Sequence, residues 1–136
     1  MRRKPGMSDL CLLDTHVLLW AVAAPGRLSP GVRALIEKQQ YATSVATLWE
    51  LMNKKGKREA PVKDPAAWWE RYVVRPQTPV LSIRAAHVLH LDHLPWHHRD
   101  PYDRILIAQS AVERMVLVTS DQEIRKYPVK TREAES

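Results

Sequence analysis

The chain has 136 residues, of which 45% are hydrophobic, so it can form one globular domain with its own core and is too apolar to be a disordered chain. It has no apolar run of the roughly 18 residues that a membrane-spanning helix needs, and its single cysteine, Cys11, excludes an internal disulfide, so we expect a cytoplasmic protein without membrane contact. Lysine and arginine outnumber aspartate and glutamate by 21 to 15, an excess that favours a polyanionic partner but also occurs on ordinary solvated surfaces.

The first residues are expected to form a short leader. Three basic residues at positions 2–4 precede a second methionine, Met7, so we expect a flexible leader or an alternative start at residues 1–7. The folded domain is expected over residues 8–131, and residues 132–136 are expected to form a tail.

Short apolar runs alternate with helical patterns in the first half of the chain. The run at 9–13 indicates a buried strand, and the apolar spacing over 17–24 indicates a helix that ends at Pro25. Ser29 lies directly before a proline, as at many helix starts, and Ser44 is a second candidate for a helix cap. These signals predict a helix from residue 30, a strand at 41–43 and a helix from residue 45 that fades by Gly56.

The second half of the chain continues the alternation after a basic stretch at 54–65 that contains glycine and proline and is expected to be a surface loop. The predicted elements are a helix at 66–74, an extended piece at 78–81, a helix capped by Ser82, a helix at 105–112, a β-branched strand at 116–119 and an extended stretch at 129–131.

This alternation predicts an α/β fold, because strands separated by helices pair in parallel through right-handed crossovers. The expected architecture is a central parallel sheet with helices on both faces. Ligands of such folds bind at the carboxyl ends of the strands. Asp14 and Asp121 directly follow two predicted strands, so we expect both carboxylates at that edge.

Four acids lie at boundaries of predicted elements: Asp14, Glu50, Asp103 and Asp121. Taken singly, each is equally well explained as a helix cap. Brought together, four carboxylates would repel one another strongly unless hard divalent cations bound between them. Mg²⁺ and Mn²⁺ bind carboxylate and phosphate oxygens, which is the chemistry of metal-assisted phosphodiester hydrolysis.

The acids lie in four sequence blocks, namely LLDTHVLLW at 12–20, WE at 49–50, HHRDPYDR at 97–104 and VTSD at 118–121. In order and approximate spacing these blocks closely resemble the PIN-domain toxins of the VapC type, and the resemblance covers about residues 8–131. It implies a PIN fold, a central parallel sheet flanked by helices.

The resemblance also implies a metal-dependent endoribonuclease that is the toxin of a type II toxin–antitoxin pair. By position, Asp14, Glu50 and Asp103 resemble the three central catalytic and metal-binding acids, and Asp121 resembles the fourth. Metal-activated water would hydrolyse RNA with Mg²⁺, for which Mn²⁺ would substitute. A VapB-like antitoxin would neutralise the toxin by placing its C-terminal region in the active-site groove, and such toxins usually form homodimers.

Other residues near the four blocks have two interpretations each. Thr15, Thr119 and Ser120 would orient water or phosphate, or would bond only to backbone. Asp100 is another candidate around the metal, although a capping role at the helix start explains it better. The basic side chains Lys54, Lys55 and Arg104 are candidate RNA contacts or solvated surface.

Two alternative functions and one candidate dimer surface remain open. The histidines at 87, 90, 93, 97 and 98 are candidate ligands for a zinc ion, but Pro95 interrupts their spacing. The basic charge alone also fits a non-catalytic nucleic-acid-binding regulatory module. For a dimer surface, the apolar residues Leu18, Leu19 and Leu35 are the candidates.

Overall fold

The protein is described by a computed structural model over residues 6–96 and 100–135. Within these residues the centre is a sheet of five strands, all parallel, in the order β3-β2-β1-β4-β5. The strands are β1 (Cys11–Leu13), β2 (Tyr41–Ser44), β3 (Val80–Leu81), β4 (Leu117–Thr119) and β5 (Thr131–Glu133). The predicted α/β fold with a parallel sheet is confirmed.

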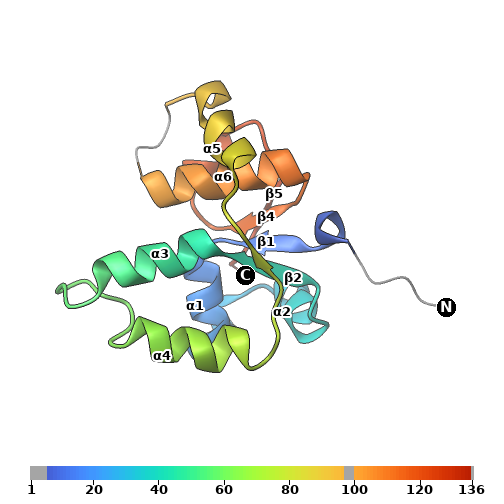
Figure 1. Ribbon diagram of the computed structural model, residues 1–136. Coiled ribbons are helices and arrows are strands. Elements are labelled where there is room, and N and C mark those ends of the chain that lie inside the picture. The colour runs from blue at the N-terminus through green and yellow to red at the C-terminus, as the bar shows by residue number, and fades with distance from the viewer. Residues whose placement is uncertain (1–5, 97–99, 136) are drawn as a thin grey trace.

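In the part of the chain that the structure describes, six α-helices connect the strands and cover the sheet. They are α1 (Thr15–Ala23), α2 (Pro30–Glu37), α3 (Val45–Lys54), α4 (Pro65–Trp69), α5 (Ala85–His90) and α6 (Pro101–Glu113). Figure 1 shows α5 and α6 on one side of the sheet and α1, α2 and α4 on the other. No helix among the described residues is long and apolar enough to cross a membrane.

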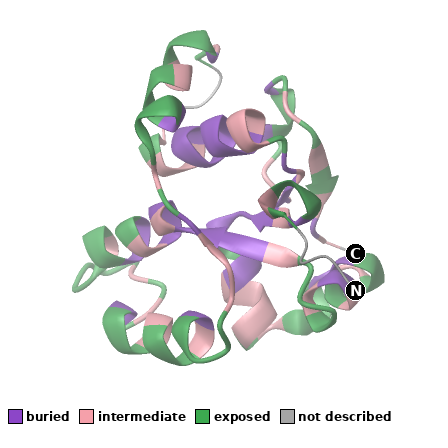
Figure 2. Ribbon diagram, turned by 45° about the vertical axis from the view of Figure 1, so that its right-hand side comes forward, coloured by how far each residue is buried: buried purple, intermediate pink, exposed green. Residues whose placement is uncertain are grey.

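The two faces of the sheet carry separate cores because consecutive strand residues point in opposite directions. Leu12 and Leu117 pack with α6, whereas their neighbours Leu13 and Val118 pack with α1 and α2. All four side chains are fully buried. Figure 2 shows the resulting gradient, with buried residues in the central strands and α6 and exposed residues on the outer helices.

The predicted caps at Ser29 and Ser44 are confirmed. Ser29 Oγ accepts a hydrogen bond from the backbone N–H of Val32 at 3.3 Å, directly before Pro30 begins α2. Ser44 Oγ accepts one from Ala46 N–H at 3.0 Å at the start of α3. Each cap starts a helix directly after a turn or strand, which fixes where the crossover leaves the sheet.

The predicted cap at Ser82 is wrong. Helix α5 begins at Ala85, and the N–H of Arg84 donates to Nδ1 of His87 at 3.0 Å. The Ser82 carbonyl instead accepts a hydrogen bond from the side-chain amide of Gln109 in α6, at 3.3 Å. His87 thus accepts from the residue before the helix, but the described residues provide no side-chain cap for the N–H groups of the first turn.

The C-terminal residues differ from the expected extended stretch at 129–131, because β5 lies at residues 131–133. Residues assigned to a tail therefore belong to the sheet edge. Ala134 is buried, and its N–H donates to the Thr119 carbonyl at 3.1 Å. Glu135 forms an ion pair with Arg27 at 2.8 Å. Because the residues of β5 are polar, no apolar run in the sequence predicted a strand there.

Of the expected leader, residues 1–5 lie outside the described residues, and Met7 packs against the core beside α6.

A buried pair joins α5 to α6. His87 is fully buried, and its Nε2 lies 2.8 Å from Oε2 of Glu113. Because Nδ1 accepts from the backbone, Nε2 of the neutral ring carries the proton and donates to the carboxylate. This hydrogen bond and the Arg84 guanidinium lower the pKa of Glu113 below its ordinary value of 4.5.

The lowered pKa of Glu113 predicts an acid-sensitive contribution to stability. Ionised Glu113 stabilises the folded state above about pH 5, and the contribution is lost as the pH falls through the lowered pKa. We expect Glu113→Gln to reduce the free energy of unfolding at pH 7 and to flatten its fall between pH 5 and 3, as measured by urea denaturation. Glu59→Gln, at an exposed position, is the matched control. Parallel pH profiles for wild type and Glu113→Gln would contradict this assignment.

Candidate active site

Asp14 and Asp121 lie at the carboxyl ends of neighbouring strands. Asp14 follows β1 directly, and its N–H donates to the Val118 carbonyl of β4 at 3.0 Å. Asp121 follows β4 by two residues. Because β1 and β4 are parallel and adjacent, the two acids belong to the same edge, as the sequence predicted.

Thr119 joins these two acids. Its buried hydroxyl donates to Oδ2 of Asp14 at 2.8 Å and accepts the N–H of Asp121 at 3.0 Å. The other candidate hydroxyl, Thr15 Oγ1, lies 3.0 Å from Thr47 Oγ1 and ties α1 to α3. Ser120 is partly buried beside Asp121. Thr119 is thus the hydroxyl that holds the Asp14 side chain.

Glu50 reaches the same region from α3. Its side chain is only 6% exposed although it lies on a helix, so it faces inward. The helix is fixed in this orientation by Ser44, whose hydroxyl donates to Oε1 of Gln109 in α6 at 2.6 Å. The sequence placed Glu50 near the helix start, and the orientation follows from these buried polar contacts.

Asp103 is held at the N-terminus of α6 by the cap at Asp100. Oδ1 of Asp100 accepts hydrogen bonds from the N–H groups of Tyr102 and Asp103, at 2.9 and 3.0 Å. The favoured capping interpretation of Asp100 is therefore confirmed. A carboxylate in the first turn of a helix is also favoured by the helix dipole.

The electrostatic interactions among the acids indicate that they are neighbours in one site. Burial, and then the negative charges of Asp14, Asp100, Glu50 and Asp121, raise the pKa of Asp103 to about 8. The pKa of Asp14 is also raised by burial, in spite of its hydrogen bond from Thr119. The neutral form of both carboxyl groups is therefore favoured more than in free aspartate.

The donor set fits a hard divalent cation. Oδ1 of Asp14 and Oε1 of Glu50 are buried and have no hydrogen-bond partner, a state that costs free energy unless a cation or water neutralises it. Within residues 6–96 and 100–135, no three Asp, Glu, His or Cys side chains already form a group that could hold a metal ion. The carboxylates are nevertheless close enough to raise the pKa of Asp103.

The candidate RNA contacts separate into three cases. Lys55 is exposed, as predicted. Lys54 instead places Nζ 2.5 Å from Oε2 of Glu50. The prediction for Arg104 is wrong, because this side chain is buried. Its guanidinium donates to the carbonyls of Pro95 and Leu91 at 2.9 and 3.3 Å and lies 3.8 Å from the ring centre of Trp96.

An aromatic contact that the sequence analysis missed joins α3 to α6 beside the acids. The rings of Trp49 and Tyr102 meet edge to face at 4.5 Å, and Asn53 Nδ2 donates to the Tyr102 hydroxyl at 2.5 Å. Trp49 and Asn53 are one helical turn apart, a spacing that places them on one face of α3. This spacing was the sequence signal that could have predicted a shared contact of Trp49 and Asn53.

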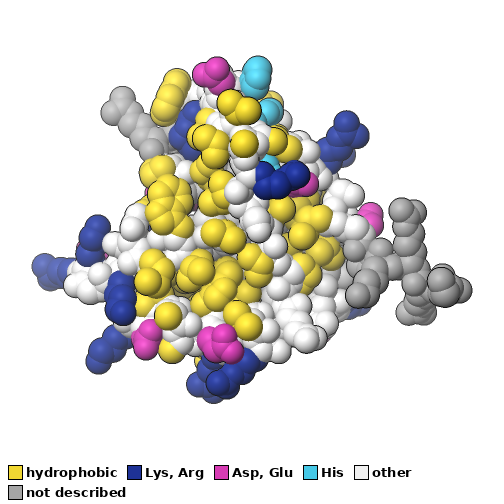
Figure 3. All heavy atoms as spheres, viewed as in Figure 1, with side chains coloured by type: hydrophobic (Ala, Val, Ile, Leu, Met, Phe, Trp, Pro, Cys, Tyr) yellow, Lys and Arg dark blue, Asp and Glu magenta, His cyan; other side chains and the backbone are white. Residues whose placement is uncertain are grey.

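An apolar groove of about 590 Å³ adjoins the site. It is lined by Trp49, Ile83, Val88, Leu91, Trp96, Pro101, Arg104 and Ile105. Figure 3 shows apolar side chains gathered over this face. The predicted dimer surface lies elsewhere and is wrong in part, since Leu18 and Leu35 are buried.

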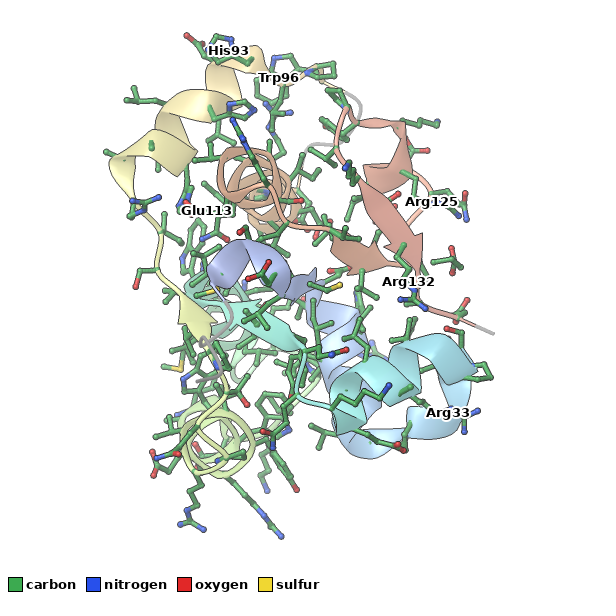
Figure 4. All side chains as sticks on the ribbon, turned by 90° about the vertical axis from the view of Figure 1, so that its right-hand side faces the viewer. Arg33, His93, Trp96, Glu113, Arg125 and Arg132 are labelled. Atoms are coloured by element: carbon green, nitrogen blue, oxygen red, sulfur yellow. The ribbon has the colours of Figure 1, made fainter. Side chains whose placement is uncertain are left out.

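The histidines do not form the alternative zinc site within the described residues. His87 binds Glu113, and the rings of His90 and His93 lie 5.5 Å apart. Figure 4 shows His93 projecting outward beyond α5. The candidates at positions 97 and 98 lie outside the described residues.

The sequence profile of the PIN domain matches residues 11–130, so the chain belongs to the PIN domain family. Two similar solved structures are VapBC2 from Rickettsia felis bound to a DNA fragment from their promoter and DNA-bound VapBC from Salmonella typhimurium. The first has a TM-score of 0.64 and 14% identity, and the match covers 93% of this chain and 99% of that chain. The second has a TM-score of 0.68 and 19% identity over 90% of this chain and 96% of that chain. No curated protein matches the chain significantly. The expected PIN fold is confirmed.

The raised pKa of Asp103 predicts that this carboxylate destabilises the metal-free fold at neutral pH. Because its folded pKa of about 8 exceeds its ordinary value of 3.8, stability is lost as the pH rises between these values. We expect Asp103→Asn to raise the free energy of unfolding by roughly 2 kcal/mol or more at pH 7, since one pKa unit corresponds to about 1.4 kcal/mol. The gain should shrink toward pH 4.

Urea denaturation in EDTA measures this effect, with Asp92→Asn at an exposed position as the control. An Asp103→Asn protein that is no more stable than wild type at pH 7 would show that the acids do not strain the fold.

Proposed function

We propose that this PIN-domain protein is an endoribonuclease that depends on Mg²⁺ or Mn²⁺. The observation that carries the proposal is the convergence of Asp14, Glu50, Asp103 and Asp121, with two buried carboxylate oxygens that lack any hydrogen-bond partner. Such a site is electrostatically unfavourable unless it binds a cation. The excess of basic residues on the chain suits an RNA substrate.

Each side chain has a distinct task in this proposal. Asp14, Glu50 and Asp103 would hold the ion, and Asp121 would add negative charge at the same edge. A divalent cation, when bound, supplies the Lewis acidity that activates water and stabilises charge on the phosphodiester group. Thr119 keeps Asp14 in one orientation through its 2.8 Å hydrogen bond. Asp103, whose pKa is about 8, would release a proton as the cation binds.

We further propose that the protein is the toxin of a type II toxin–antitoxin pair and is neutralised by a VapB-like antitoxin. Two similar solved structures are VapBC complexes, which supports this partner. The apolar groove beside the acids suits a protein segment, because it exposes Trp49 and Trp96 by 41% and 77%. The proposal also includes that the protein forms a homodimer and that it acts in the cytoplasm.

The proposal predicts cleavage that requires both metal and acids. The purified protein, freed of any antitoxin, should cut total cellular RNA into discrete fragments with Mn²⁺ or Mg²⁺ and not with EDTA. Asp14→Asn should reduce the rate by roughly 100-fold or more, because it removes a ligand charge that no neighbour replaces. Gel electrophoresis of the RNA measures both effects.

Asp92→Asn is the matched control, since this exposed aspartate lies outside the acidic site. RNA binding without cleavage by wild type in every metal would reject the nuclease and favour the non-catalytic nucleic-acid-binding module. Equal cleavage by wild type and Asp14→Asn would indicate a contaminating nuclease.

A further inference from the structure

The ammonium group of Lys54 lies inside the acidic site. Its Nζ is 2.5 Å from Oε2 of Glu50, and the charges of Asp100 and Asp103 also act on it. A lysine side chain is charged at neutral pH, so Lys54 brings one positive charge into the acidic site.

This contact differs from an ordinary ion pair on a helix surface. Glu50 and Lys54 are four residues apart, a spacing at which exposed pairs contribute little. Here the Glu50 side chain is 6% exposed and that of Lys54 is 31% exposed, so the pair points into the protein. The aspartates that act on Lys54 come from a different element, at the N-terminus of α6.

The end of α3 is fixed where it carries Lys54. Asn53 donates to the hydroxyl of Tyr102, and the Trp49 ring packs against the Tyr102 ring, so two contacts hold this turn against the start of α6. Lys54 is the last residue of α3, directly before the chain leaves the helix. The fold thus positions the ammonium group between Glu50 and the acids of α6.

The oxygens of Asp14 and Glu50 differ in their partners. Oδ2 of Asp14 accepts a hydrogen bond from Thr119, and Oε2 of Glu50 accepts one from Lys54. Among the described residues, the other buried oxygen of each acid has no hydrogen-bond partner. Carboxylate oxygens of this kind are the ligands that a hard divalent ion prefers. An ion at Glu50 would lie near the positive charge of Lys54 and would be repelled by it.

We propose that Lys54 is a resident counter-cation of the acidic site and that its ammonium group, held at Oε2 of Glu50, competes with a divalent ion for this carboxylate. This inference rests on the proposed function. Lys54 then supplies the second positive charge, and its partly exposed ammonium group contacts the phosphodiester of the RNA. Preorganised charge of this kind stabilises the transition state of phosphoryl transfer.

Mn²⁺ binding tests the inference directly. Titration calorimetry of the full chain at pH 7 measures this affinity. Lys54→Met should bind Mn²⁺ about tenfold more tightly than wild type, because a competing positive charge is gone. Lys54→Arg keeps the charge and should bind Mn²⁺ as wild type does. Lys38→Met, at an exposed lysine directly after α2, is the matched control and should behave as wild type.

RNA cleavage by Lys54→Met is expected to change in the opposite direction to its Mn²⁺ affinity. Cleavage by Lys54→Met should fall although metal binding tightens, whereas a merely structural lysine would leave both unchanged. Circular dichroism checks that the variants fold.

The outcomes separate the two proposals. Identical Mn²⁺ affinity of wild type and Lys54→Met would overturn the role of Lys54. Absence of Mn²⁺ binding by wild type would overturn both proposals. The expected binding without any RNA cleavage by wild type would retain the counter-cation and reject the nuclease.

Discussion

The buried carboxylates near the carboxyl ends of β1 and β4 and at the start of α6 repel one another, and the rest of the fold has to hold them in place. Burial and the neighbouring acids raise the pKa of Asp103 to about 8, far from the ordinary value of 3.8. Such a cluster would spread apart if its side chains were attached to mobile segments. It persists because each acid is carried by an element that the two cores fix to the sheet.

Buried polar contacts complete this arrangement. Thr119 orients Asp14, Ser44 connects the start of α3 to Gln109 of α6, and Thr15 meets Thr47 between α1 and α3. Each contact satisfies polar atoms that would otherwise be costly to bury, and each joins two elements that carry an acid. Lys54 adds the one positive charge that contacts Glu50 among the described ion pairs.

The sequence predicted the parts of the site that depend on local rules. Asp14 and Asp121 were placed at one edge because acids that follow parallel strands share that edge, and Asp100 was recognised as a cap from its position before a proline. The burial of Arg104 and the inward direction of Lys54 were not predictable, because both depend on which elements pack beside them. Leu18 was misassigned to a dimer surface for the same reason, since a helical apolar stripe does not indicate whether it faces a core or a partner.

If the acids form a strained site which a divalent cation relieves, the protonation of Asp103 must respond to that cation. Carbon NMR of the Asp103 carboxyl group, titrated from pH 4 to 9 with and without Mg²⁺, measures that protonation. We expect a midpoint near 8 in EDTA and a lower midpoint with Mg²⁺, because the cation favours the ionised form. A midpoint near 4 in both conditions would contradict it.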